Sequence, residues 1–483
     1  MLFIFVLNNM FIKLSFMKNL KYLAGRIIAL SIIVLLLISC KKNSNNNPPE
    51  VILSVHPTTG TTLTPINIDL SESKDFEDHI SKLEMRVDWE SDGVWDSDWT
   101  AEKNHANQYG SEGNHIIRVE MRDTDGTVTS TSESLKITNS THLVPTNSPF
   151  SYNVGINYET WTMGRANRDI DKDLDTITKY FKLIKTYHTA AVGKSQLTMD
   201  PTMLKVVNYI LAHEDAKLEL ALGTNNNVLA DGGYGKPFTP GLMTSKTYTD
   251  SWVQMLISAF VTKANVKKYI KVILLGNEID ANGPPSSDSH FIDYYTKWIP
   301  QAFDSLKASL ADAGLQDIPV STIIANYPLS DPTSFKVQYT SVKHIKDNWS
   351  PDWNSKESFV LFNQYTPDSG KSTDFGPVIN YFENVESTLS DSPNVYVGET
   401  GYSAEYGEAN EAKVINQVFT WLESQYSVNK LTVPLFVFMA YDRSKKAVGQ
   451  KKMGIFNENS NTNAPEGIKK DINLPSWISK PKN

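Results

Sequence analysis

From about residue 150 to residue 483 the chain repeats one pattern, a short apolar run followed by a longer segment with helical periodicity. The apolar runs are Tyr152–Asn157, Leu183–Tyr187, Leu218–Leu222, Val272–Gly276, Val320–Ala325, Phe359–Phe362, Val395–Gly398 and Leu435–Met439. Segments of helical period lie between them, for example Pro201–His213, Trp252–Thr262, Tyr294–Leu310 and Ala412–Ser424. Eight successive βα units predict a (β/α)8 barrel, the TIM-barrel architecture, over residues 150–483.

An open, doubly wound sheet is the alternative for the same alternation of strands and helices. Such sheets place a Gly-rich phosphate-binding turn after the first strand. No turn of this kind follows Tyr152–Asn157. The closed barrel is therefore favoured.

Residues 51–138 show a different pattern, in which apolar and polar residues alternate over short segments. Ile66–Leu70, Glu84–Trp89 and His115–Met121 alternate in this way, and Gly-containing turns separate the segments. These features predict a small all-β sandwich. The segments Val87–Gly93, Tyr109–Gly113 and Val119–Asp123 resemble the polycystic-kidney-disease type (PKD) immunoglobulin-like domain. We interpret this domain as a spacer, joined to the barrel by a linker over residues 139–149.

Acidic residues and tryptophans cluster within the predicted sandwich. Asp88, Glu90, Asp92, Asp96 and Asp98 are spaced like the start of a calcium loop, but Trp99 stands where a bidentate glutamate would be needed. A solvated acidic turn is the alternative interpretation. Trp89, Trp95 and Trp99 would form either a sugar-stacking strip or one core residue with edge aromatics.

The N-terminal residues have the composition of a secretory signal. Basic residues precede an apolar run from Ile27 to Ile38, which is short for a membrane span. Leu37–Cys40 resembles a bacterial lipobox, which implies a signal peptide over residues 1–39 and lipidation of Cys40. Residues 40–50 are mostly polar and include Pro48 and Pro49, as expected of a flexible tether. We expect a protein anchored in the outer membrane of a Gram-negative-type cell envelope, on its surface or periplasmic face; a transmembrane anchor is the alternative.

Composition limits the partners and the chemistry. The formal net charge of -8 and the sequence pI near 5.7 argue against a nucleic-acid partner and fit an uncharged or a cationic substrate equally well. Cys40 is the single cysteine, so disulfides and thiol chemistry are not expected after lipidation. The nine histidines show no metal-ligand spacing. We expect no cofactor, no catalytic metal and a monomeric protein.

Two glutamates follow predicted strands directly. Glu278 follows the fourth strand and Glu399 follows the seventh, separated by three βα repeats of about 40 residues. Carboxyl ends of barrel strands meet at one face, so both side chains are expected to face a common cleft. Retaining glycoside hydrolysis needs two carboxyl groups about 5–5.5 Å apart. The sequence thus predicts Glu278 and Glu399 as a catalytic pair of carboxyl groups.

At these positions the chain resembles glycoside hydrolase family 17, the β-1,3-glucanase family of a large retaining TIM-barrel clan. Gly276–Glu278 matches the Asn-Glu acid/base motif of the clan, and Gly398–Tyr402 is similar to the nucleophile motif of the family. The likeness continues in Gly155–Tyr158, Lys185–Tyr187, Asn363–Tyr365, Phe436–Asp442 and Met453–Phe456. It covers residues 150–457. The resemblance implies a retaining β-glucanase acting on laminarin-type glucan.

Four positions depart from the family pattern. Met439 stands where the family usually has glutamate, and Arg443 and Lys445 replace acidic and tryptophan residues. Lys185 replaces an arginine, which keeps the charge but loses the planar guanidinium. These changes spare both glutamates and leave the linkage preference open.

Further residues near strand ends are candidates for substrate binding. Asn277 is expected to donate to the sugar 2-hydroxyl, and Glu278 is expected to have a raised pKa. Tyrosines are expected to orient the carboxylates or line the cleft, and two aromatic rings to stack on sugars. The candidates are Asn277, Tyr158, Tyr187, Tyr327, Asn363, Tyr365, Tyr402, Asp442 and Trp161. A β-1,3-glucanosyltransferase and a catalytically silent glycan-binding lipoprotein are the alternative functions.

Overall fold

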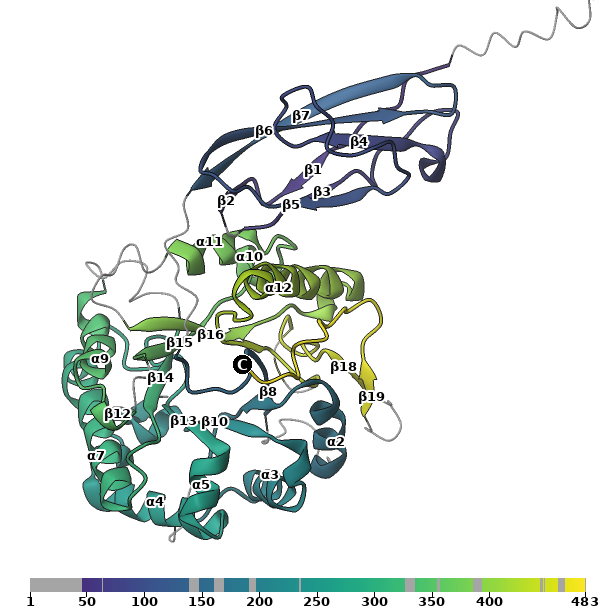
Figure 1. Ribbon diagram of the computed structural model, residues 1–483. Helices are drawn as coiled ribbons and strands as arrows, with labels where there is room; N and C mark the ends of the chain where they lie inside the picture. Colours follow the sequence, from purple (N-terminus) through teal and green to yellow (C-terminus); the bar gives the residue numbers. More distant parts are fainter. Residues whose placement is uncertain are drawn as a thin grey trace, which may run out of the picture.

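The protein consists of a β-sandwich joined to a barrel of strands and helices (Figure 1). The computed structural model describes residues 46–62, 64–138, 147–159, 169–190, 197–233, 236–325, 335–353, 357–384, 393–443, 446, 448–458 and 465–482. The predicted signal peptide, Cys40 and residues 139–146 of the predicted linker lie outside these ranges. Among the described helices, none is both long enough and apolar enough to cross a bilayer.

The larger domain is a closed barrel of eight parallel strands in the order β10-β13-β14-β15-β16-β17-β8-β9. Its strands in chain order are β8 Val154–Asn157, β9 Leu183–Lys185, β10 Glu219–Gly223, β13 Ile270–Leu275, β14 Val320–Ile324, β15 Phe359–Asn363, β16 Asn394–Thr400 and β17 Leu435–Val437. Almost every residue of these strands is buried, because neighbouring strands cover their edges and helices cover their outer face. The predicted barrel and its eight strands are confirmed.

Several helices of the barrel begin at a side chain that caps them. Asp200 caps α3 by accepting hydrogen bonds from the amides of Thr202 and Met203, and Pro201 takes the first helical position. The barrel helices are α2 Ile170–Tyr180, α3 Pro201–Ala212, α4 Lys246–Ala259, α5 Lys263–Tyr269, α6 Phe291–Asp293, α7 Ile299–Asp312, α9 Lys336–Asp347, α10 Pro367–Gly370, α11 Gly376–Asn384 and α12 Glu408–Asn429.

Three of the predicted helical segments differ in extent from the structure. The segment predicted at Ala412–Ser424 is the middle of the longer helix α12. The segment predicted at Trp252–Thr262 begins earlier, at Lys246, because the Ser245 hydroxyl caps it. The segment predicted at Tyr294–Leu310 starts with a π-helical turn, Tyr294–Trp298, before α7. Pro300 has no amide hydrogen to donate to the preceding turn, which explains the break in the regular ladder.

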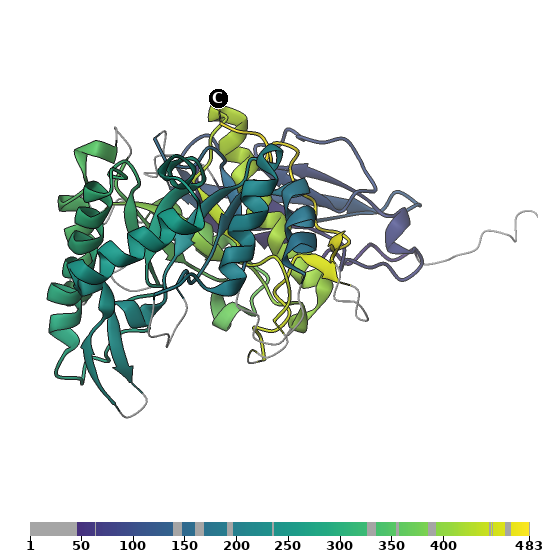
Figure 2. The same ribbon diagram turned by 90° about the horizontal axis from the view of Figure 1, so that it is seen from below.

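Short hairpins are added to the barrel. After β10 the chain forms an antiparallel pair, β11 Ala230–Gly233 with β12 Lys236–Pro240, which projects from the body of the domain (Figure 2). A second pair, β18 Phe456–Glu458 with β19 Pro465–Ile468, follows the last barrel strand. Described residues between β17 and β18, among them Phe438 and Met453, line a cavity at the end of the barrel.

The smaller domain is a sandwich of two sheets. One sheet has the order β1-β3-β5, and the other has the order β2-β7-β6-β4. The strands are β1 Ser54–His56, β2 Thr59–Thr61, β3 Ile66–Asp69, β4 Glu84–Asp88, β5 Asn104–Asn107, β6 Gly113–Arg122 and β7 Val128–Thr138. Alternate residues of these strands fill a core of their own, separate from the barrel core. The predicted sandwich is confirmed.

The three tryptophans of the sandwich do not form a free strip for stacking on sugars. Trp89 is buried in the core, in line with the second interpretation above. The Arg86 guanidinium lies 3.9 Å from the Trp95 ring centroid and 4.5 Å from that of Trp99. Cation–π contacts therefore already occupy a face of both outer rings.

The sandwich contacts the barrel at α11, on the outside of the barrel (Figure 1). The Asn380 side chain donates to the carbonyl oxygen of Thr59 over 2.7 Å, and His56 lies 3.9 Å from Asp374. Burial would raise the pKa of Asp374, but the hydrogen bonds from His56 and from the amide of Gly376 hold it below its usual value.

Candidate active site

Glu278 and Glu399 lie at the same end of the barrel and line one cavity of about 790 Å³. Glu278 follows β13, the fourth strand in chain order, and Glu399 belongs to β16, the seventh. Gly276 and Glu278 both have positive φ, 70° and 50°, so the chain turns sharply as it leaves β13. The barrel thus brings together two carboxyl groups that lie far apart in the sequence.

Three donors surround the carboxylate of Glu399, and the residue as a whole is only 4% exposed. Lys185 Nζ lies 3.1 Å and the Tyr187 hydroxyl 2.8 Å from Oε1. The Tyr365 hydroxyl lies 2.7 Å from Oε2. An ionised carboxylate accepts hydrogen bonds only, so this set of donors suits the charged form and fixes its orientation.

The donors to Glu399 are themselves fixed by the barrel. The Tyr187 hydroxyl also lies 2.9 Å from Asn157 Oδ1, and Asn157 Nδ2 contacts the carbonyl oxygen of Gly398 over 3.2 Å. Burial, and then the charge of Glu399, raise the pKa of Tyr187 and of Tyr365 well above the usual phenol value. Both hydroxyls therefore keep the proton that they donate.

Lys185 is fully buried beneath the cavity. Burial lowers the pKa of its ammonium, and the carboxylate of Glu399 opposes that effect. Its Nζ also lies 4.4 Å from the ring centroid of Tyr187. Lys185 supplies the positive charge that offsets the burial of Glu399.

Glu278 has a different environment. The Asn363 side chain donates to Oε1 over 3.1 Å, and Asn282 Nδ2 lies 3.4 Å from Oε2. Burial, followed by the negative charge of Glu399, raises the pKa of Glu278 above the usual carboxyl value, while Asn363 and Lys185 oppose this shift. Glu278 is thus biased toward the protonated form, as the sequence predicted.

Asn277, beside Glu278, is held through its main chain. Its amide donates to Asn226 Oδ1 over 2.7 Å, and Asn226 Nδ2 donates to the Asn277 carbonyl over 2.7 Å. This reciprocal pair leaves the Asn277 side chain at the cavity, with Oδ1 3.5 Å from Asn363 Nδ2. The sharp turn after β13 therefore has a fixed geometry.

The two carboxyl groups have complementary environments. The hydrogen-bond donors and the ammonium around Glu399 favour its charge, whereas the surroundings of Glu278 favour a proton. One group can therefore act as a nucleophile while the other donates a proton. This division of labour is the one that a two-step displacement at an acetal carbon requires.

Of the candidates named from the sequence, Tyr187, Asn277, Asn363 and Tyr365 line the cavity together with the two glutamates. Tyr327 and Trp161 lie outside the described residues. The four candidates at the cavity lie at or just after the ends of the second, fourth and sixth strands in chain order, and they line the cavity as the sequence predicted.

Three candidates face elsewhere and correct the sequence-based expectation. The Tyr158 hydroxyl donates to Asp173 on α2 over 2.7 Å, and its ring is buried. Tyr402 is also buried, and its hydroxyl donates to the carbonyl oxygen of Lys371 over 2.8 Å. Asp442 accepts the amide of Gly454 over 2.8 Å. None of the three lines the cavity, because each side chain turns toward the surrounding helix and loop layer.

Four residues of the site were not among the substrate-binding candidates chosen from the sequence: Lys185, Asn157, Glu159 and Arg443. Arg443 Nη1 lies 3.2 Å from Glu159 Oε2, and both residues line the cavity. Lys185 and Asn157 belong to motifs that carry the family resemblance, and their place in these motifs could have identified them as site residues. The pairing of Glu159 with Arg443 joins the ends of the first and last strands and has no local signature.

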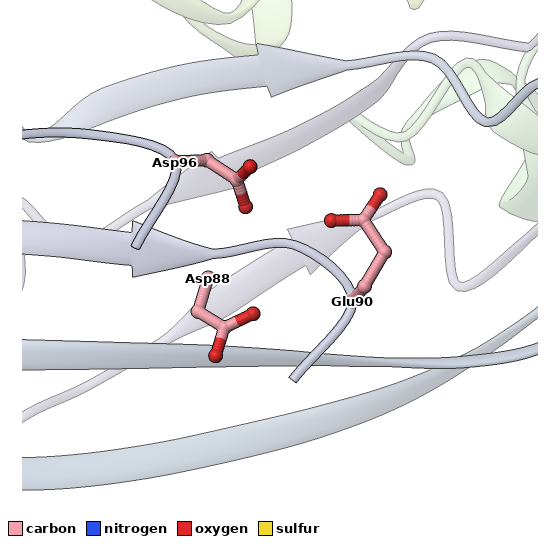
Figure 3. A group of neighbouring side chains, drawn as sticks. All are labelled: Asp88, Glu90 and Asp96. Atoms are coloured by element: carbon pink, nitrogen blue, oxygen red, sulfur yellow. The ribbon is translucent and has the colours of Figure 1, made fainter. Parts of the chain in front are cut away.

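A group of acidic side chains lies in the sandwich, away from this cavity (Figure 3). Carboxylate oxygens of Asp88, Glu90 and Asp96 lie within 4.8 Å of one another. Asp88 accepts the amides of Asp92 and Gly93, and Asp96 accepts the amide of Trp89. These bonds are those of an acidic turn, one of the two interpretations given above.

No protein-family model and no curated protein sequence matches the chain. Among solved structures, one of plant β-glucan endohydrolases is 14% identical with a TM-score of 0.44, covering 62% of this chain and 96% of that one. A family 39 glycoside hydrolase from Bacteroides cellulosilyticus is 13% identical with a TM-score of 0.43, over 86% and 80% of the two chains.

The sandwich also has a structural counterpart. The PKD1 domain of Vibrio anguillarum Epp is 13% identical with a TM-score of 0.15, covering 20% of this chain and 98% of that one. With TM-scores below 0.5, none of these likenesses determines a function. The functional assignment therefore depends on the geometry of the cavity.

Proposed function

We propose that this chain is a retaining glycoside hydrolase that cleaves β-glucan, with β-1,3-glucan as the preferred substrate. The observation that carries the proposal is the contrast between Glu399 and Glu278 across one cavity. Three donors hold Glu399 as a carboxylate. Burial and the charge of Glu399 raise the pKa of Glu278, which favours its protonated form.

In the first step, an oxygen of Glu399 attacks the anomeric carbon and the bond from that carbon to the glycosidic oxygen breaks. Glu278 transfers its proton to the departing oxygen, which leaves as an alcohol. The products are a glycosyl ester on Glu399 and an ionised Glu278. We assign to the Asn277 side chain, which lines the cavity beside Glu278, the hydrogen bond to the 2-hydroxyl of the sugar.

In the second step, Glu278 removes a proton from water, and the water oxygen attacks the anomeric carbon. The ester bond to Glu399 breaks, the carboxylate is restored and Glu278 is again protonated. Two inversions at one carbon retain its configuration. The three donors to Glu399 stabilise it as the leaving group of this step.

The substrate class rests on the resemblance of the sequence to glycoside hydrolase family 17. Glu278, Glu399, Asn363 and Tyr365 stand in its motifs, and all four line the cavity. We further propose lipid anchoring through Cys40 at the outer membrane, with the sandwich as a spacer. Mass spectrometry of the membrane fraction, compared with a Cys40→Ser variant, tests the anchor.

Rescue with azide tests both the function and the two roles. The full chain and its Glu278→Ala and Glu399→Ala variants would be incubated with laminarin, lichenan and an activated aryl β-glucoside. We expect the wild type to release reducing sugar from laminarin and both variants to lose this activity. With azide and the aryl substrate, Glu278→Ala should form a β-glycosyl azide, because azide replaces the water of the second step.

The Glu399→Ala variant should form an α-glycosyl azide, because azide then replaces the nucleophile of the first step. If Glu278→Ala formed the α-glycosyl azide and Glu399→Ala the β-glycosyl azide, the roles of the two glutamates would be exchanged. Absence of hydrolysis of every β-glucan, with binding retained, would overturn the enzyme function. Products longer than the substrate would indicate transfer to a sugar hydroxyl.

A further inference from the structure

The loop that leaves β17 is basic in an otherwise acidic chain. Residues 443–452 contain five basic residues and no aspartate or glutamate, whereas the whole chain has a net charge of -8. Within this loop, Arg443, Lys446, Gly449 and Gln450 line the same cavity as Glu278 and Glu399. Positive charge is therefore concentrated on one wall of the cavity.

Arg443 is buried in that wall with only 13% of its side chain exposed. It pairs with Glu159, and its guanidinium carbon lies 4.7 Å from the ring centroid of Phe438. Its Nε–H finds no acceptor among the residues that the structure describes. A buried donor without an acceptor is unfavourable, and an oxygen of a ligand would satisfy it.

Lys446 adds a second cation to the same wall. Within the described part of the chain, no carboxylate lies within 4.0 Å of its Nζ. Two carboxylates that contact the loop already have partners in it. Glu159 pairs with Arg443, and Glu405 accepts hydrogen bonds from the amides of Gly449 and Lys451 over 2.7 and 3.0 Å. The carboxylate of Glu405 thus holds the loop in place by binding main-chain amides of the loop.

We infer that the cavity accepts a glucan that carries an anionic group, a carboxylate or a sulfate, on the sugar seated against Arg443 and Lys446. The inference rests on the proposed glycoside hydrolase function and narrows its substrate. A neutral sugar offers no charge to the Lys446 ammonium or to the Nε–H group of Arg443, which the pairing with Glu159 leaves without an acceptor among the described residues. An anionic substituent accepts charge-assisted hydrogen bonds from both side chains.

Matched oligosaccharides test this inference. A neutral β-1,3-gluco-oligosaccharide would be compared with the same oligosaccharide oxidised at C6 to glucuronate and with its sulfated form. The wild type, Lys446→Gln and Arg443→Gln would be assayed for kcat/KM on all three. Lys452→Gln is the control, because Lys452 is an exposed lysine of the same loop that does not line the cavity.

We expect the wild type to prefer at least one anionic form about tenfold, a factor that one charge-assisted hydrogen bond supplies. Lys446→Gln and Arg443→Gln should reduce the ratio of anionic to neutral kcat/KM, and Lys452→Gln should leave it unchanged. Added salt should reduce the preference. The carboxylated and sulfated arms identify which anion is bound.

The inference would be overturned if the wild type had a kcat/KM on the neutral oligosaccharide equal to or greater than that on both anionic forms, and if Lys446→Gln left the ratio of anionic to neutral kcat/KM unchanged. Binding of the same ligands to Glu399→Gln, measured by calorimetry, separates this result from failure of the proposed function. Preferential binding of an anionic ligand without hydrolysis by the wild type would support the inference and contradict the enzyme function. Equal binding of neutral and anionic ligands would contradict the inference.

Discussion

The ammonium of Lys185 lies 3.1 Å from Oε1 of Glu399, and the two side chains are 0% and 6% exposed. Both charges are thus removed from water at the floor of the cavity. Such a pair offsets its desolvation only while both partners are present. The stability of the barrel and the geometry of its proposed nucleophile therefore depend on one contact between strands β9 and β16.

Replacement of Lys185 by methionine should destabilise the barrel. The change leaves Glu399 buried without its cation, and breaking a buried pair in this way costs about 3–5 kcal/mol. Urea unfolding followed by circular dichroism would measure the loss. Lys205→Met, at an exposed position of α3, is the matched control and should change stability by less than about 0.5 kcal/mol. Equal stability of the two variants would contradict the role given to Lys185.

Tyr365→Phe should reduce activity more than Tyr187→Phe. Among the described residues, Tyr365 is the donor to Oε2 of Glu399, whereas Oε1 keeps Lys185 when Tyr187 loses its hydroxyl. A hydrogen bond to a charged group contributes about 1.5–3 kcal/mol, so kcat/KM on laminarin should fall about 10- to 100-fold in Tyr365→Phe. The reverse order of the two variants would contradict this assignment.

The fall in activity at high pH, the alkaline limb of the pH profile, should follow the loss of the proton from Glu278. Its pKa is raised by burial and by Glu399, and the protonated form is the proposed acid, so kcat/KM should fall as pH rises through this pKa. Asn363→Leu removes a hydrogen bond that lowers the pKa, so the limb should move to higher pH. Asn282→Leu, whose amide lies 3.4 Å from Oε2, should move it less. An unmoved limb in Asn363→Leu would contradict the assignment of Glu278.

The barrel should work without the sandwich. The two hydrophobic cores share no residue, and no described residue of the sandwich lines the cavity. A chain of residues 147–482 should therefore fold and keep kcat/KM on a soluble oligosaccharide within about twofold, a change of less than 0.5 kcal/mol in the barrier. A folded barrel with strongly reduced turnover would show that the sandwich contributes to catalysis.

The amino-acid sequence by itself determined the barrel, the sandwich and the positions of Glu278 and Glu399 at the ends of strands. These features depend on local patterns: buried parallel strands read as apolar runs, and the carboxyl ends of barrel strands share one face. Tyr187, Asn363 and Tyr365 were found for the same reason.

Only the tertiary structure decided which side chains meet. Closure of the barrel places Lys185 against Glu399 and Arg443 against Glu159, contacts that no local pattern specifies. Tyr158 and Tyr402 also follow strand ends, yet their hydroxyls bind Asp173 and the Lys371 carbonyl in the outer layer. Successive side chains leave a strand in opposite directions, so the direction at a strand end depends on the turn and the packing that follow it.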